Sequence, residues 1–78
     1  MFFEVWDNVS GNIIGTWDTK EEALAVLRGA LAEHGPEYVE TLYLGQENTR
    51  GGGKAIADGT TLVNLVRASM RKASAHQV

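Results

Sequence analysis

The segment of this chain that comes closest to a chemical motif is Arg-Gly-Gly-Gly-Lys at positions 50–54. Glycines let backbone N–H groups approach an anion, and a lysine beside them can reach its charge. The spacing of a Walker phosphate loop is missing, because that loop needs glycine where Asn48 stands and serine or threonine where Ala55 stands. A strand, not a helix, is also expected after the segment. We therefore predict a hairpin tip whose two cations contact phosphate only nonspecifically.

The acidic and histidine side chains show no spacing typical of a catalytic site. Six glutamates are predicted on the solvated side of a helix or beside a strand, not around a common pocket: Glu21, Glu22, Glu33, Glu37, Glu40 and Glu47. His34 is expected at a helix end and His76 in the C-terminal tail, without a serine and an aspartate at suggestive local spacing. The absence of cysteine excludes disulfide and thiolate-zinc scaffolds. We predict that the protein is not an enzyme and that it uses no metal or other cofactor.

One helix, predicted over residues 18–34, organises the rest of the chain. Its apolar residues fall on one broad side at helical spacing: Ala23, Leu24, Val26, Leu27, Ala30 and Leu31. Two capping-box pairs are possible at its start: Asp18 with Glu21, or Thr19 with Glu22. The Gly-Pro dipeptide after residue 34 ends it. We expect this helix to pack on a sheet through Ala23, Leu27, Ala30 and Leu31.

A β-hairpin is predicted before this helix, because residues 2–7 and 13–17 are rich in aromatic and β-branched side chains and flank a turn segment. Its register is open by one residue. With Gly11 as the bulge residue of the turn, the expected pairs are Phe3–Trp17, Glu4–Thr16, Val5–Gly15, Trp6–Ile14 and Asp7–Ile13. Large apolar side chains then occupy both faces: Phe3, Val5, Ile13 and Trp17 on one, and Phe2, Trp6 and Ile14 on the other. One helix cannot cover both.

Two further strands are predicted in the second half of the chain. Alternation at residues 41–47 places Leu42 and Leu44 on one face and Tyr43 on the other. A short strand at residues 55–57 follows the glycine-rich connection and is expected to pair antiparallel with it.

A second helix is predicted to begin at Thr60 or Thr61. Its apolar side comprises Leu62, Leu65, Val66, Ser69 and Met70, with Val63 at the margin. Residues 73–78 lack periodicity and are predicted to form a flexible tail. The sequence thus predicts a single α+β domain over residues 1–72, of order ββαββα, with a four-stranded antiparallel sheet and two helices.

The compartment is predicted from the N-terminus, which starts with a strand-like run and lacks the basic region and long apolar stretch of a signal peptide. No segment is long enough to span a membrane. At 78 residues, the chain is near the lower limit at which one core is self-sufficient. We expect a cytoplasmic protein without membrane contact.

Charge is distributed unevenly along the chain. Residues 1–47 hold nine of the ten acidic residues, whereas five of the seven basic ones follow: Arg50, Lys54, Arg67, Arg71 and Lys72. Such asymmetry can indicate contact with nucleic acid, although a short chain can also fold it into one mixed surface. Nucleic-acid binding through these five residues is the alternative function, and steep weakening with salt is its signature. An RNA-binding sheet of the RRM kind is disfavoured, because the strands that hold the aromatic side chains are acidic.

The first half of the chain resembles a group of known small proteins. FEVWD at residues 3–7, SGN at 10–12 and TWDTKEEAL at 16–24 resemble the hairpin and Thr-x-Glu-Glu-Ala-Leu helix start of small uncharacterised prokaryotic proteins, over about half the chain. The layout is also similar to that of the DUF2188 group and, more remotely, of HicB-type antitoxin domains and SPOR domains. These likenesses rest on turn and cap chemistry, so no site residue is carried over. The HicB-type resemblance implies a partner toxin, although this chain lacks an obvious DNA-binding extension.

The leading functional hypothesis is a small non-catalytic module, regulatory or antitoxin-like, that binds a protein partner or itself. Its predicted interface comprises Phe2, Trp6, Ile14 and Tyr43. Such a patch exceeds what soluble monomers usually leave in water, unless the second helix covers it. We therefore expect a homodimer with two-fold symmetry.

Overall fold

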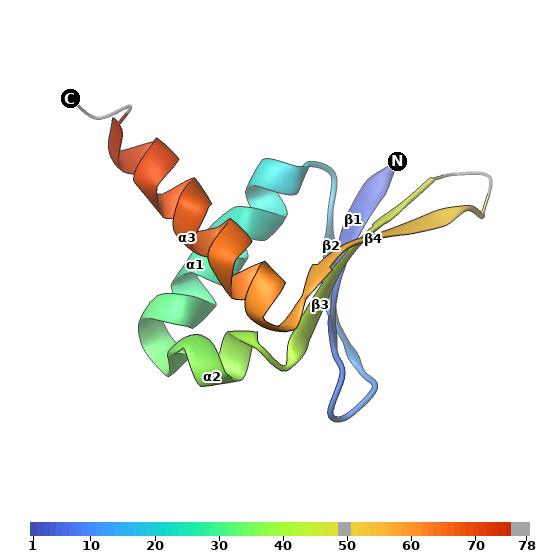
Figure 1. Ribbon diagram of the computed structural model, residues 1–78. Coiled ribbons are helices and arrows are strands. Elements are labelled where there is room, and N and C mark those ends of the chain that lie inside the picture. The colour runs from blue at the N-terminus through green and yellow to red at the C-terminus, as the bar shows by residue number, and fades with distance from the viewer. Residues whose placement is uncertain (49–50, 76–78) are drawn as a thin grey trace.

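The computed structural model describes residues 1–48 and 51–75. The chain forms seven elements, shown in Figure 1: β1 (Phe2–Asp7), β2 (Ile13–Trp17), α1 (Lys20–His34), α2 (Pro36–Val39), β3 (Leu42–Glu47), β4 (Gly53–Asp58) and α3 (Gly59–Ala75). The four strands make one antiparallel sheet in the order β2-β1-β3-β4. This α+β architecture confirms the predicted ββαββα order. The four-residue α2, which proline begins, is an addition to it.

The β1–β2 hairpin departs from the predicted register near its turn. Its first three residue pairs agree with the prediction. Trp6 then pairs with Ile13 instead of the expected Ile14. The cause is a tighter turn, since the N–H of Asp7 donates to the carbonyl of Asn12 (2.8 Å) and β2 must absorb one extra residue in a bulge. The prediction that Ile13 shares the face of Phe3 and Val5 was therefore wrong, because the bulge puts it opposite Trp6.

The side chain of Asp7 shapes this turn. Its Oδ1 accepts hydrogen bonds from the N–H of Val9 (2.8 Å) and of Ser10 (3.4 Å), and Gly11 supplies the positive φ of 76°. The hydrogen bond from Val9 is the main reason that the pKa of Asp7 lies below its ordinary value. The turn is thus held by an ionised carboxylate.

Both ends of α1 are capped by the residues that flank it. The Oγ1 of Thr19 accepts from the N–H of Glu22 (3.1 Å) and donates to its Oε1 (3.0 Å), which selects the second of the two predicted capping boxes. At the other end, the N–H of Gly35 donates to the carbonyl of Leu31 (3.0 Å). Gly35 has φ 86°, a conformation that favours glycine.

The buried side of α1 is narrower than the sequence predicts. Ala23, Leu24 and Leu27 are buried, and Ala30 and Leu31 are half-buried against the core. Val26, which was expected on this side, is 42% exposed. It lies about 100° around the helix from Leu27, at the margin of the stripe.

In the second half of the chain, the last strand and the last helix are longer than predicted. β4 covers Gly53–Asp58 because its backbone pairing with β3 extends through the glycine and lysine before residue 55. α3 starts at Gly59, before either predicted threonine cap, and stays helical to Ala75, three residues into the predicted tail. Val63, expected at the margin, is buried, whereas Met70 is 39% exposed. The apolar side of α3 is therefore rotated toward Val63.

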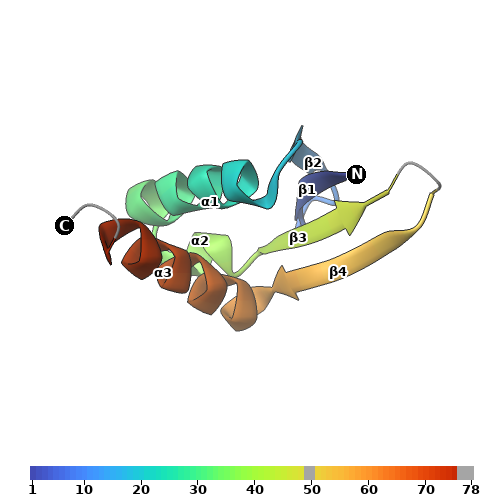
Figure 2. The same cartoon turned by 90° about the horizontal axis from the view of Figure 1, so that it is seen from above.

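Both long helices pack on the same face of the sheet, as Figures 1 and 2 show. Leu27 of α1, Leu62 of α3, and Val5 and Leu44 of the strands meet in one core cluster, each at most 1% exposed. The C-terminal helix therefore does not cover the second face of the hairpin. In the described part of the chain, the opposite face of the sheet carries no helix. Among these same residues, no helix has the length and apolar character needed to cross a membrane.

Candidate protein-binding surface

The face of the sheet opposite the helices is the candidate site. Side chains alternate along a strand, and directly opposed residues of antiparallel strands share a face. The register therefore assigns the following large or charged side chains to this surface, which we call the open face: Phe2, Glu4, Trp6, Ile13, Ile14, Tyr43, Glu47 and Asp58. All four predicted interface residues belong to it.

Two aromatic residues form the centre of the open face. Trp6 of β1 and Tyr43 of β3 are direct cross-strand neighbours, and both are half-buried. The ring of Tyr43 lies over Gly45, where a Cβ atom would approach its Cε1 to 2.7 Å. Gly45 thus leaves room for the ring to lie along the sheet. A third aromatic residue of the open face, Phe2, is also half-buried and lies at the start of β1.

Two isoleucines extend this surface to the edge of the sheet. Ile13 and Ile14 of β2 are 45% and 44% exposed. β2 is an edge strand and carries no charged residue. Sequence reasoning placed Ile13 on the other face, because it did not anticipate that Asp7 would tighten the turn. An aspartate that begins a turn segment is the signal for such an Asx-type closure.

Acidic side chains border the aromatic centre. Glu4 lies opposite Gly45 and Glu47 opposite Phe2, so the two glutamates are diagonal neighbours on adjacent strands. The pKa of Glu47 is raised, first by its partial removal from water and then by the negative charge of Glu4 and a hydrogen bond between the two carboxyl groups. The open face thus combines rings with a repelling pair of carboxyl groups.

Replacing Glu47 with Gln is expected to remove a loss of stability that the wild-type protein undergoes as the pH rises. Because Glu47 binds its proton more tightly in the folded than in the unfolded chain, its contribution to stability is present at acidic pH and is lost as the pH rises through its raised pKa. The wild-type protein should therefore lose stability relative to Glu47→Gln as the pH rises above about 4, the ordinary pKa range of a glutamate. Asp7 has a lowered pKa, so its contribution to stability increases as the pH rises. This contribution is the same in the wild type and in Glu47→Gln.

Urea unfolding at a series of pH values measures this difference. Glu33→Gln is the matched control, since Glu33 is an exposed carboxylate on α1, on the other side of the sheet. Its curve should run parallel to that of the wild type. A parallel curve for Glu47→Gln as well would contradict the carboxyl pair.

The residues of the alternative hypothesis are spread over the molecule. Arg50 lies outside the described residues. Lys54 is the second residue of β4, near the hairpin that joins β3 and β4, whereas Arg71 and Lys72 lie in the last turns of α3. Figure 2 shows that these two places are at opposite ends of the molecule. Arg67 and Arg71 are exposed and share a side of α3 at a spacing of four residues. The described residues of this hypothesis are therefore not all brought to one surface.

Within residues 1–48 and 51–75, no cluster of three or more His, Cys, Asp or Glu side chains is arranged to hold a metal ion. Comparison of the chain with protein-family models, curated proteins and solved structures found no match.

Proposed function

We propose that this protein is a non-catalytic, cytoplasmic protein-binding module that acts through the open face. We also propose that two copies pair at the β2 edge of this face as a two-fold homodimer when no other partner is bound. One observation carries the proposal: both long helices cover the same side of the sheet, and the other side presents bulky apolar residues. The biological form we propose is regulatory and antitoxin-like, in which the module acts by occupying a partner.

The composition of the open face supports a protein partner. Trp6, Tyr43 and Phe2 are aromatic residues of the type that is enriched at the centre of interfaces. Glu47 and Asp58 lie beside them at the ends of β3 and β4, whereas Glu4 lies between Phe2 and Trp6 on β1. Large apolar residues on a face that no helix covers mark an interaction surface on a small domain.

The edge of the sheet supports a second copy as partner. β2 presents the backbone groups of an edge strand, and its five residues include neither a charge nor a proline that would oppose pairing with another chain. Antiparallel contact of β2 with itself around a two-fold axis brings like residues together without charge repulsion. Such an isologous contact closes at two copies.

Replacing Ile14 with Glu is expected to weaken self-association at least about tenfold, because it places a carboxylate in the apolar contact. Val26→Glu is the matched control, because Val26 is also β-branched and is 42% exposed against 44% for Ile14, but lies on α1. Sedimentation equilibrium over the micromolar range measures the dimer dissociation constant. Wild type and Val26→Glu should be dimers in equilibrium with monomer, with the same constant.

Two outcomes would contradict the dimer. The first is a wild-type protein that stays monomeric over the whole concentration range. The second is an equal effect of the two substitutions, which would place the contact elsewhere. Far-UV circular dichroism of each variant establishes that the fold is retained, as expected for exposed positions.

Nucleic-acid binding receives less support, because the basic residues Lys54, Arg71 and Lys72 lie at two separate ends of the molecule. Oligonucleotide binding at low salt that weakens steeply with salt, and that is reduced by loss of Arg67 and Arg71, would favour it over the module proposed here.

A further inference from the structure

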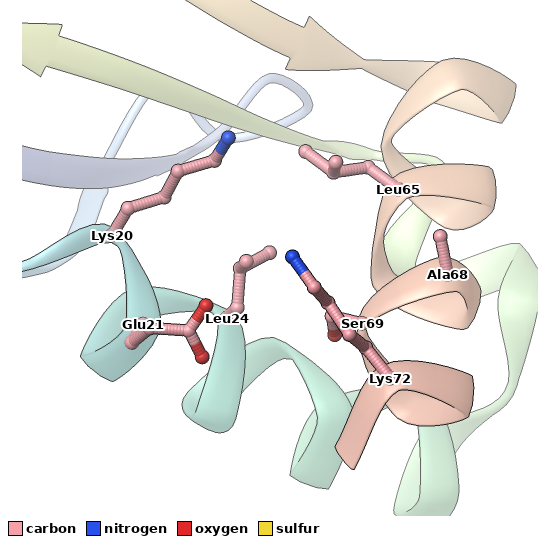
Figure 3. A pocket seen from close by; sticks show the side chains of 7 residues that line it. All are labelled: Lys20, Glu21, Leu24, Leu65, Ala68, Ser69 and Lys72. Atoms are coloured by element: carbon pink, nitrogen blue, oxygen red, sulfur yellow. The ribbon is translucent and has the colours of Figure 1, made fainter. Parts of the chain in front are cut away.

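A groove of about 200 Å³ lies between α1 and α3, on the helical side of the molecule and away from the open face. Figure 3 shows its lining. Leu24 from α1 and Leu65 from α3 provide apolar walls, and Ala68 leaves space between the turns of α3. This volume is below that of drug-like ligand pockets, so the groove suits a small molecule.

Two lysines reach this groove from opposite walls. Lys20 belongs to the first turn of α1 and Lys72 to the last turns of α3, and in Figure 3 both side chains extend over the space beside Leu24. In the described part of the chain, neither ammonium group has an ion-pair partner. The lining contains one carboxylate, Glu21. The groove therefore carries an excess of positive charge over an apolar surface.

A third cation, Arg28, joins the two helices that form the walls of the groove. The Nη1 of Arg28 on α1 donates to the Oγ of Ser69 on α3 (3.1 Å), and this hydroxyl donates in turn to the carbonyl of Val66 (2.8 Å). Ser69 itself lines the groove. This link fixes the spacing of the two helices where the groove lies, so the space exists before a ligand enters. Preformed space of this kind lowers the cost of binding.

These observations define the chemistry of a ligand. The ammonium groups of Lys20 and Lys72 would attract a single negative charge in the groove, and a short apolar chain would cover Leu24 and Leu65. The carboxylate of Glu21 opposes a second negative charge. We propose that the groove between α1 and α3 binds a small organic monoanion, a carboxylate with a short aliphatic chain. This site is independent of the open face.

Hexanoate is a suitable probe of the proposed site. Titration of the full chain with sodium hexanoate, followed by ¹H–¹⁵N correlation spectra at constant ionic strength, should give a dissociation constant on the order of 1 mM. The shifted signals should belong to the first turns of α1 and to residues 65–72. Acetate has the charge without the chain, and hexan-1-ol has the chain without the charge. Both should bind at least about fivefold more weakly than hexanoate.

Three variants separate the groove from the general charge of the protein. Lys20→Gln and Lys72→Gln should each weaken hexanoate binding at least about threefold. Arg71→Gln is the matched control, because it removes the same charge from the exposed neighbour of Lys72 that does not line the groove. Its affinity should stay within about twofold of the wild type. Ala68→Phe, which fills the groove from an exposed helical position, should abolish binding.

The proposal is overturned if hexan-1-ol binds as well as hexanoate, if Arg71→Gln weakens binding as much as Lys72→Gln, or if Ala68→Phe binds normally. Ile14→Glu should bind hexanoate like the wild type, because the open face lies on the other side of the sheet. A failure of self-association therefore leaves this test intact, and a failure of hexanoate binding does not affect the test of the open face.

Discussion

Replacing Leu27 with Ala is expected to lower the free energy of unfolding by about 2–5 kcal/mol. Leu27 is 1% exposed and lies where α1 meets α3 and the sheet, so the shorter side chain leaves a cavity lined by both layers. A chain of this length has a total stability of only about 4–12 kcal/mol. The substitution should therefore remove a large fraction of it and markedly lower the urea midpoint.

The neighbouring residue provides the control for this experiment. Val26→Ala removes two methyl groups from a side chain that is 42% exposed. Its effect on the urea midpoint should correspond to less than about 0.5 kcal/mol. Equal midpoints for Leu27→Ala and Val26→Ala would contradict the packing of α1 through Leu27.

Replacing Gly35 with Ala is expected to destabilise the protein by about 1–3 kcal/mol. Gly35 has φ 86° and ψ 172°, a region that residues with a Cβ atom avoid, and its N–H must stay in place to cap the carbonyl of Leu31. An added Cβ would also lie 3.2 Å from the Oε2 of Glu37. The substitution therefore strains the junction between α1 and α2.

A glycine-to-alanine substitution in the middle of α1 should instead stabilise the protein. Gly29 is helical and exposed, and a Cβ atom there would meet nothing within 4 Å. Gly29→Ala should therefore stabilise the protein by about 0.5–1 kcal/mol through its better helix propensity. Thermal unfolding followed at 222 nm compares the two variants with the wild type. Shifts of the same sign for both variants would show that the junction at Gly35 is not strained by a side chain.

The elements that the sequence predicts well are those set by neighbours in the chain. Thr19 and Glu22 satisfy the free N–H groups of the first turn of α1, and the glycine after residue 34 ends it, so the helix bounds follow from contacts within a few residues. The alternation of Leu42 and Leu44 with Tyr43 likewise assigns each side chain of β3 to a face. Periodicity and capping depend on residues that are close in the sequence, so both can be predicted from the sequence alone.

The register of the hairpin shows where local reasoning fails. The structure has the Asp7–Asn12 pair instead of the predicted Asp7–Ile13 pair, and its turn is held by hydrogen bonds such as that from the N–H of Val9 to the carboxylate of Asp7. The periodicity of the two strands does not predict this choice. This choice decided the face on which Ile13 lies. It therefore also decided part of the candidate binding surface.

The sequence by itself determined the α+β class, the order of the strands and long helices along the chain, and the two apolar faces of the hairpin. Only the tertiary structure decided that α1 and α3 share one face and leave Phe2, Trp6 and Tyr43 on the other. The physical reason is that each face of the hairpin offers a helix a comparable apolar surface. The choice is then made by helix–helix packing, in which Leu27 meets the buried residues of α3 in one core, and by contacts between segments distant in the sequence, such as the bond from Arg28 to Ser69.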